Sequence, residues 1–279
     1  MTAAARKIIL CADDYGLSPS VNVAIRDLIA RRRLNATTVM VLPPSFNRDE
    51  AVALDALNAN GNRVAIGLHV TLTAPFKPAV AGFAPLRDEA FLPLRDTLRA
   101  ALARRFEPDR LAAEITAQLQ KFAEAFGRTP DFLDGHQHVQ LFPQIRDAFL
   151  AVAAKDAPQA WVRQCGRSGR LAKRLRDRKG LLLDVLSVRF RTKARQLGVR
   201  TNPAFAGTYS FAADADFAAL FPAYLDGLPD GGLVMCHPGT VDAELERLDP
   251  LTTGRERELT YFKSDEFPRQ LVDNNVELA

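Results

Sequence analysis

The residues best suited to chemistry in this sequence stand at the ends of short apolar runs. The segment DFLDGHQHVQLFP, residues 131–143, contains His136 and His138, two of only four histidines in the chain. The other two are His69 in IGLHVTL and His237 in LVMCHPG. Imidazoles in such positions are candidates for metal binding or proton transfer.

Paired carboxylates end a fourth apolar run, KIILCADDYG, which closes on Asp13 and Asp14. In parallel α/β proteins the carboxyl ends of the strands gather on one face, where active sites are built. We therefore expect these two aspartates and the histidines of the other runs to meet at one site.

One carboxylate and two imidazoles of this set would form a catalytic metal site. Asp14, His69 and His136 come from separate segments and leave positions open for water and substrate. Such a donor set suits Zn²⁺ and accepts other divalent ions such as Mg²⁺. Taken singly, a histidine at a strand end is more often a hydrogen-bonded structural residue than a ligand, and an Asp-Asp pair before a glycine is often only a turn and helix cap, so the prediction depends on the whole set.

The remaining polar residues predict a division of roles. Side chains of adjacent strand residues diverge, so Asp14 would bind the ion while Asp13 acts as a base, because water held by a metal needs a carboxylate to take its proton. His237 could protonate a leaving group. Arg163, in another strand-like run, could orient Asp13 or stabilise an oxyanion.

The role of His138 is open. A strand over 132–139 would place Asp134, His136 and His138 on one face, since residues two apart on a strand point the same way. His138 is then an alternative ligand to His136, a substrate contact, or a packed core residue.

Strands and helices alternate along the whole chain. We expect strands at 6–14, 36–42, 64–72, 132–139, 160–165 and 232–236, with shorter ones at 205–211 and 276–278. We expect helices after Ser18, at 48–58, at 108–126, after Pro143, at 214–225 and at 255–275. This alternation predicts one parallel-sheet domain, open or closed into a barrel.

Two connecting segments stand out. Residues 74–95 are rich in proline and predict a long loop that covers the site. Residues 167–200 are rich in Lys and Arg and hold only two acids, Asp177 and Asp184. We interpret this segment as a solvated basic helix pair; the alternative is a surface for anionic ligands or lipid headgroups, with peripheral membrane contact.

Composition excludes several classes of protein. The chain has 279 residues, 47% of them hydrophobic and 25% charged, with a net charge of +4 that does not by itself imply nucleic acid. Cys11, Cys165 and Cys236 have no CxxC spacing and predict buried free thiols in a reducing compartment. With no signal-peptide pattern and no apolar run approaching ~18 residues, we expect a cytoplasmic protein.

Four ordered motifs resemble a known family. ADDYGLS, GLHVTLT, LDGHQHVQLFPQI and MCHPG are similar to the signature blocks of the YdjC-like carbohydrate deacetylases, which include bacterial chito-oligosaccharide deacetylases. The resemblance runs from about residue 8 to 239, and the tail around 248–258 is also similar. It implies a distorted (β/α) TIM-like barrel, a divalent metal ion and removal of an acetyl group from an N-acetylated amino sugar.

The resemblance also implies roles for single residues. Asp14, His69 and His136 match the family's metal ligands, Asp13 its base and His237 its acid. Members of the family are often dimers, so we expect a homodimer.

The sequence departs from the family's pattern at three places. The family often has Phe at the position of Tyr15, Ser at Gly135 and His at Gln140. These departures leave the metal set intact and bear on the sugar-binding rim, where Tyr15, His138 and Arg163 are the expected substrate contacts. The long basic segment is unlike that of a chito-oligosaccharide enzyme; a related branch is associated with hopanoid lipid biosynthesis, and a glycolipid substrate would fit it.

Two other functions are compatible with the residues. One is a different metal-dependent hydrolase on the same barrel, acting on another amide or on a phosphoester. The other is a non-catalytic sugar- or glycolipid-binding protein with a decayed site, which the intact set of aspartates and histidines argues against.

Overall fold

A parallel sheet forms the centre of the protein. The computed structural model describes residues 4–58, 63–167, 178–211 and 215–279. The strands of this sheet are β1 (Arg6–Tyr15), β2 (Ala36–Val39), β3 (Ala65–Val70), β6 (Phe132–Gly135), β7 (Trp161–Val162), β8 (Phe205–Ala206), β9 (Leu233–Cys236) and β10 (Val276–Leu278). Their order is β7-β6-β3-β2-β1-β9-β8, β10 pairs with β1, and every pairing is parallel.

The two ends of the sheet approach each other. Isolated parallel bridges join Val162 to Thr201 and Arg167 to Phe205, so the segment that continues β7 reaches β8. The sheet is therefore curled toward closure, although irregular backbone rather than a regular strand ladder connects its ends. The expected single-domain, distorted (β/α) barrel is confirmed.

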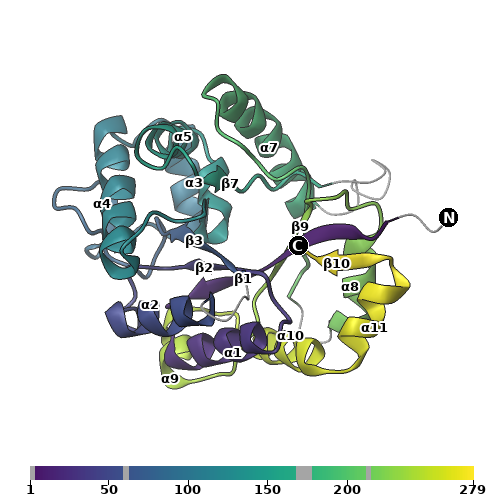
Figure 1. Ribbon diagram of the computed structural model, residues 1–279. Helices are drawn as coiled ribbons and strands as arrows, with labels where there is room; N and C mark the ends of the chain where they lie inside the picture. The colour runs from purple at the N-terminus through teal and green to yellow at the C-terminus, as the bar shows by residue number, and fades with distance from the viewer. Residues whose placement is uncertain (1–3, 59–62, 168–177, 212–214) are drawn as a thin grey trace.

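Helices lie around the outside of the sheet (Figure 1). They are α1 (Pro19–Ala30), α2 (Arg48–Asp55), α3 (Leu94–Leu102), α4 (Pro108–Phe126), α5 (Ile145–Asp156), α7 (Arg178–Gln196), α8 (Phe217–Leu225), α9 (Ala243–Leu248), α10 (Thr253–Lys263) and α11 (Glu266–Asp273). The expected caps are present: the Ser18 side chain accepts a hydrogen bond from the Val21 amide, and Gly127 ends α4 with a left-handed φ of 69°.

The predicted strand over 132–139 is wrong in its second half. Strand β6 ends at Gly135, and His136–Leu141 form a short 3₁₀ segment. Gln137 and His138 within it have left-handed φ angles of 55° and 63°. This turn breaks the strand's alternation of faces, so Asp134 stays in the sheet while the two histidines after it turn toward the strand ends.

The loop after β3 is fixed to α4. It contains a small hairpin, β4 (Leu86–Arg87) with β5 (Ala90–Phe91), and leads into α3, a helix that the sequence did not predict. The fully buried Glu114 accepts hydrogen bonds from the amides of Ala79 (3.1 Å) and Val80 (2.9 Å). A buried carboxylate of α4 thus holds the loop in place through two backbone amides.

Part of the basic segment is a helix. Residues 168–177 lie outside the described part of the chain, while α7 packs against α5 through a face that includes Leu183 and Phe190. Leu182, Val185 and Val188 are exposed on it. In the described residues no helix is long and apolar enough to cross a membrane. All three cysteines are free and buried, as predicted.

Replacing Glu114 by Ala should loosen this loop. The amides of Ala79 and Val80 would lose their acceptor, which should lower the free energy of unfolding by about 1–3 kcal/mol. Urea denaturation measures the loss, and limited proteolysis should show new cleavage within 74–93. Glu124→Ala, at an exposed position of the same helix, is the control; equal stability of both variants would contradict the anchoring.

Candidate active site

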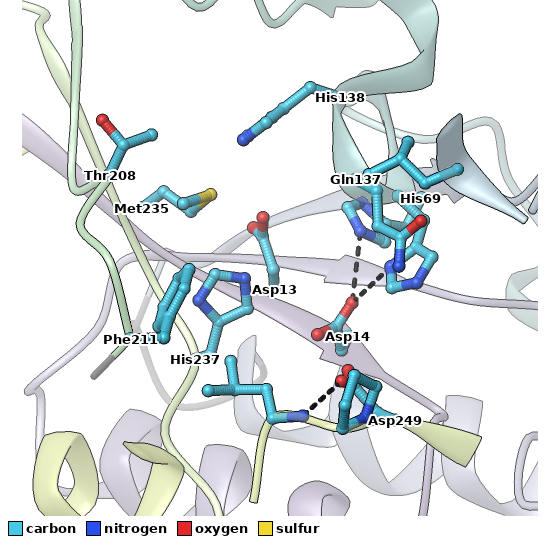
Figure 2. A pocket seen from close by; sticks show the side chains of 14 residues that line it. Asp13, Asp14, His69, Gln137, His138, Thr208, Phe211, Met235, His237 and Asp249 are labelled. Carbon is cyan, nitrogen blue, oxygen red and sulfur yellow. Dashed lines mark hydrogen bonds and ion pairs between the residues drawn. The ribbon is translucent and has the colours of Figure 1, made fainter. Parts of the chain in front are cut away.

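A cavity of about 360 Å³ opens where β1, β3, β6 and β9 end. All four histidines of the chain, Asp13 and Asp14 line it, together with Leu94, Phe211 and the segment 249–251. In the view of Figure 2, Asp14 and two imidazoles stand on one side, His237 and Phe211 on the other, and Asp13 lies between them. The strand-end pattern of the sequence therefore did identify residues that meet.

The two neighbouring aspartates both reach the cavity because β1 is irregular at this point. Its pairing with β2 shifts register between Ala12 and Tyr15, and Asp14 has a left-handed φ of 70°. On a regular strand the two side chains would point to opposite faces; an irregularity of this kind re-aims one of them. The two carboxylates nonetheless face different partners.

Asp13 is held by an arginine. The Arg163 guanidinium donates to Asp13 through Nη1 (2.6 Å to Oδ2) and Nη2 (2.5 Å to Oδ1), and its Nη2 lies 2.6 Å from Asp134 Oδ2. All three side chains are buried. Burial opposes ionisation of Asp13, but the charge and hydrogen bonds of Arg163 outweigh it and lower the pKa of Asp13 to about 2.

Asp14 stands among two imidazoles and a second arginine. Its Oδ1 lies 3.2 Å from His69 Nε2 and 3.1 Å from His136 Nδ1, the two dashed lines on Asp14 in Figure 2. Its Oδ2 accepts a hydrogen bond of 2.6 Å from Arg255 Nη2. Burial raises the pKa of Asp14, yet Arg255 and the imidazoles together hold it well below its usual range.

These donors fit a divalent ion. One ligand atom each from Asp14, His69 and His136 lie within 4.8 Å of one another. His69 Nδ1 is 2.6 Å from Asp134 Oδ1, which orients the ring with Nε2 toward Asp14, the arrangement that carboxylates give to metal-binding histidines. Burial lowers the pKa of His69, but the opposite effect of Asp134, Asp14 and Asp13 is larger, and the net result is a pKa raised to about 10.

A second group of possible ligands, Asp13 with His69 and Asp134, is as close-set. It fits a cation less well, because Arg163 already lies between the two carboxylates. The buried guanidinium supplies the positive charge that an ion would otherwise bring there. The first group is therefore the better candidate.

His237 faces Asp13 from the neighbouring strand. Ala12 of β1 pairs with Cys236 of β9, which sets His237 level with Asp13. Its imidazole lies edge-on to Phe211, with 5.4 Å between ring centroids. Burial lowers the pKa of His237 to about 4, although the charges of Asp14 and Asp13 act in the opposite direction.

The three expected substrate contacts lie in different places. His138 lines the cavity, with Nδ1 3.5 Å from Cys165 Sγ. Arg163 lies beneath Asp13 and is fully buried, which supports the orienting role rather than contact with substrate. The Tyr15 side chain is directed away from the cavity and its hydroxyl donates to Glu50 Oε2 (2.6 Å), so the structure does not bring it to the site.

Two departures from the family pattern fit each other. A Cβ atom at Gly135 would lie 2.8 Å from Gln140 Oε1 and 3.0 Å from the Gln140 backbone nitrogen. Gln140 in turn donates to the Arg163 carbonyl at 3.2 Å. The absence of a side chain at 135 thus makes room for the glutamine that supports the backbone at Arg163, directly after β7.

Sequence reasoning missed several residues at the site. The strand pattern singles out Asp134 only by its face, and Arg255 and Glu258 are simply part of the helix expected at 255–275. Arg255 is fully buried and also binds Asp249 (2.8 Å), and Glu258 accepts the His237 backbone amide (2.5 Å). The signal available was their spacing of three residues, which puts both on one face of α10.

Comparison with known proteins gives a family match and several similar proteins, among them a relative and a solved structure. A family model described as YdjC-like protein matches residues 7–273. A chitooligosaccharide deacetylase of Citrobacter koseri is 29% identical over 241 residues, which cover 85% of this chain and 83% of that protein. A crystal structure from Enterococcus faecalis V583, provisionally named a cellobiose-phosphate cleavage protein, superposes with a TM-score of 0.73 at 23% identity, covering 99% of this chain and 97% of that one. The last match shows a shared fold.

Replacing Arg163 by Met should be strongly destabilising. Asp13 and Asp134 would remain buried without their shared cation, a loss of about 3–5 kcal/mol in the free energy of unfolding. Arg163→Lys keeps the positive charge but loses the paired hydrogen bonds of the guanidinium, so its free energy of unfolding should lie between those of Arg163→Met and the wild type.

Guanidinium denaturation of both variants measures these losses. Arg99→Met is the control, because Arg99 is an exposed partner of Asp96 and its loss should cost less than about 1 kcal/mol. If Arg163→Met were as stable as Arg99→Met, the buried pair would not hold the site together.

Proposed function

This chain belongs to the YdjC-like protein family, and on that premise we propose that it is a metal-dependent hydrolase that removes the acetyl group from an N-acetylated amino sugar. The name of the Citrobacter koseri relative, a chitooligosaccharide deacetylase, supports this substrate class. The sugar is an oligosaccharide or the head of a glycolipid.

One observation carries the proposal. A metal-ligand set, a separate carboxylate and a separate imidazole line the same cavity: Asp14 with His69 and His136, then Asp13, then His237. Hydrolysis of an unactivated amide needs all three functions, since water must be activated, the oxyanion stabilised and the departing nitrogen protonated.

The metal ligands would be Asp14 Oδ1, His69 and His136. A divalent ion held there, Zn²⁺ or Mg²⁺, supplies Lewis acidity toward the acetyl carbonyl and lowers the pKa of water. Asp134 orients His69, and Arg255 occupies Oδ2 of Asp14, which leaves Oδ1 facing the imidazoles. The chain's own side chains thus fix the direction of each ligand.

Asp13 takes a proton from the attacking water. Arg163 holds its carboxylate in place and keeps it ionised at neutral pH, in agreement with its lowered pKa. The water oxygen adds to the carbonyl carbon. His237, on the other side of Asp13 in Figure 2, is neutral in the empty site because its pKa is lowered; once it has taken up the proton that leaves the water, it gives that proton to the amide nitrogen as the carbon–nitrogen bond breaks. The products are acetate and a free amino sugar.

The remaining walls would hold the sugar. His138 and Gln137 offer polar groups at one edge of the cavity, while Leu94, Phe211 and Leu251 offer apolar surface. Of the three substrate contacts expected from the sequence, we retain His138.

Acetate release from N-acetylglucosamine oligomers, with and without added Zn²⁺ or Mg²⁺, tests the reaction. We expect metal-dependent release of acetate and no release of phosphate from phosphoesters. Bound metal with phosphate release instead of acetate would replace the proposal by a phosphoesterase. A glycolipid substrate is indicated if only N-acetylated glycolipids release acetate.

Single variants separate the roles. Asp13→Asn should keep bound metal and lose turnover by about 10²–10⁴-fold, because only the base is removed. His69→Ala should lose the metal, as measured by elemental analysis. An Asp13→Asn variant with full activity would reject the base assignment.

His138 and His136 provide a matched pair for ligand choice. His136→Ala should lose the metal, whereas His138→Ala should retain it and raise KM, because His138 is outside the ligand group. If His136→Ala kept the metal and His138→Ala lost it, His138 rather than His136 would be the metal ligand.

Three expectations from the sequence stay predictions. Light scattering tests the homodimer, and pelleting with anionic vesicles tests peripheral membrane contact by the basic segment, including α7. The cytoplasmic location is tested by fractionation of cells.

A further inference from the structure

Glu258 is a buried carboxylate on α10 that the reaction does not use directly. It is fully buried, and its two oxygens accept hydrogen bonds from two different segments. Oε2 accepts the backbone amide of His237 at 2.5 Å, and Oε1 accepts the hydroxyl of Tyr209 at 2.7 Å. A carboxylate with both oxygens engaged fixes the distance between the two donors.

The two segments are connected a second time through aromatic rings. Tyr209 packs against Phe211 with 4.1 Å between centroids, and Phe211 packs edge-on against the His237 imidazole at 5.4 Å. The contacts form a closed circuit of four residues: Glu258 to His237, His237 to Phe211, Phe211 to Tyr209, and Tyr209 back to Glu258. The circuit joins the end of β9, the segment after β8 and α10.

The His237 imidazole packs against the ring of Phe211. In the described part of the chain, the buried Nδ1 of His237 has no hydrogen-bond partner. A carboxylate on Nδ1 is the usual way to orient a catalytic imidazole. Here the orientation must come from the backbone amide on one side and the Phe211 ring on the other.

We propose that Glu258 is a positioning residue that places the His237 imidazole, by binding the His237 amide directly and by seating Phe211 through Tyr209. The placement is independent of the reaction; the catalytic consequence rests on the proposed role of His237 as proton donor. Burial disfavours the ionised form of Glu258. Desolvation raises its pKa to about 7, although the hydrogen bonds from Tyr209 and the His237 amide act in the opposite direction.

Ring resonances of the four histidines test the placement without any assay of activity. In histidine-labelled protein, His237→Gln identifies the His237 signal. Glu258→Gln and Tyr209→Phe should both shift that signal and leave those of His69 and His136 in place, because those rings are held by Asp134 and Asp14.

Two matched controls are available. Glu256→Gln changes an exposed carboxylate on the same helix. Tyr224→Phe removes a buried hydroxyl that has no hydrogen-bond partner among the described residues. Neither should move the His237 signal. An unchanged His237 signal in both Glu258→Gln and Tyr209→Phe would overturn the proposal, whatever the reaction proves to be.

Kinetics test the consequence for catalysis. A misplaced proton donor should lower kcat for amide hydrolysis by about 10-fold with KM unchanged. Acetate release from an activated phenyl ester, whose leaving group needs no proton, should stay near wild type in Glu258→Gln. A merely structural defect would lower both rates together and would contradict the positioning role.

A double-mutant cycle completes the test. Once His237 is replaced by Gln, adding Glu258→Gln should have no further effect on kcat, because its effect passes through the imidazole. Additive losses would contradict the proposal. If wild-type protein releases no acetate from any amide, the proposed function fails, while the ring resonances still decide the placement.

Discussion

Asp13 and Asp14 are neighbours in the chain, and their buried carboxylates enter the same cavity. Two ionised carboxylates this close would normally share a proton. Each instead has its own buried arginine: Arg163, 150 residues away in sequence, binds Asp13, and Arg255, 241 residues away, binds Asp14. Both pKa values are lowered as a result, so both groups are ionised when the site is empty of substrate. The different roles proposed for Asp13 as base and Asp14 as metal ligand depend on these two arginine–aspartate pairs.

The arginines also define what each aspartate can do. Arg163 engages both oxygens of Asp13 and so holds the whole carboxylate beside the cavity. Arg255 engages only Oδ2 of Asp14, and the other oxygen faces the two imidazoles. The same residue type therefore has a different environment one position along the chain. Asp134 extends the network, because it contacts both Arg163 and His69 and thereby connects the base side to the ligand side.

The strand-end rule predicted the residues that meet and Arg163 as a residue that could orient Asp13, but not the other residues that hold them. Asp14, His69 and His237 could be placed from sequence because apolar runs mark buried parallel strands and the polar residue after each run must lie at the carboxyl edge. The other supporting residues, such as Arg255, do not follow an apolar run. Arg255 lies in a stretch, GREREL, whose many charges indicate an exposed helix turn, and only tertiary contact shows that it is buried. The left-handed turn at His138 is likewise set by packing around 135–141 rather than by local propensity.

Helix α10 brings the two sides of the site into one rigid frame. Arg255 and Glu258 are three residues apart and so share a face of the helix. The first binds Asp14 among the possible metal ligands, and the second binds the backbone of His237. The distance between these two groups is therefore set by one helical turn, in addition to the pairing of β1 with β9. A shift of α10 would move Asp14 and His237 together and so preserve their relative position. The pairing of β1 with β9 fixes the same distance independently.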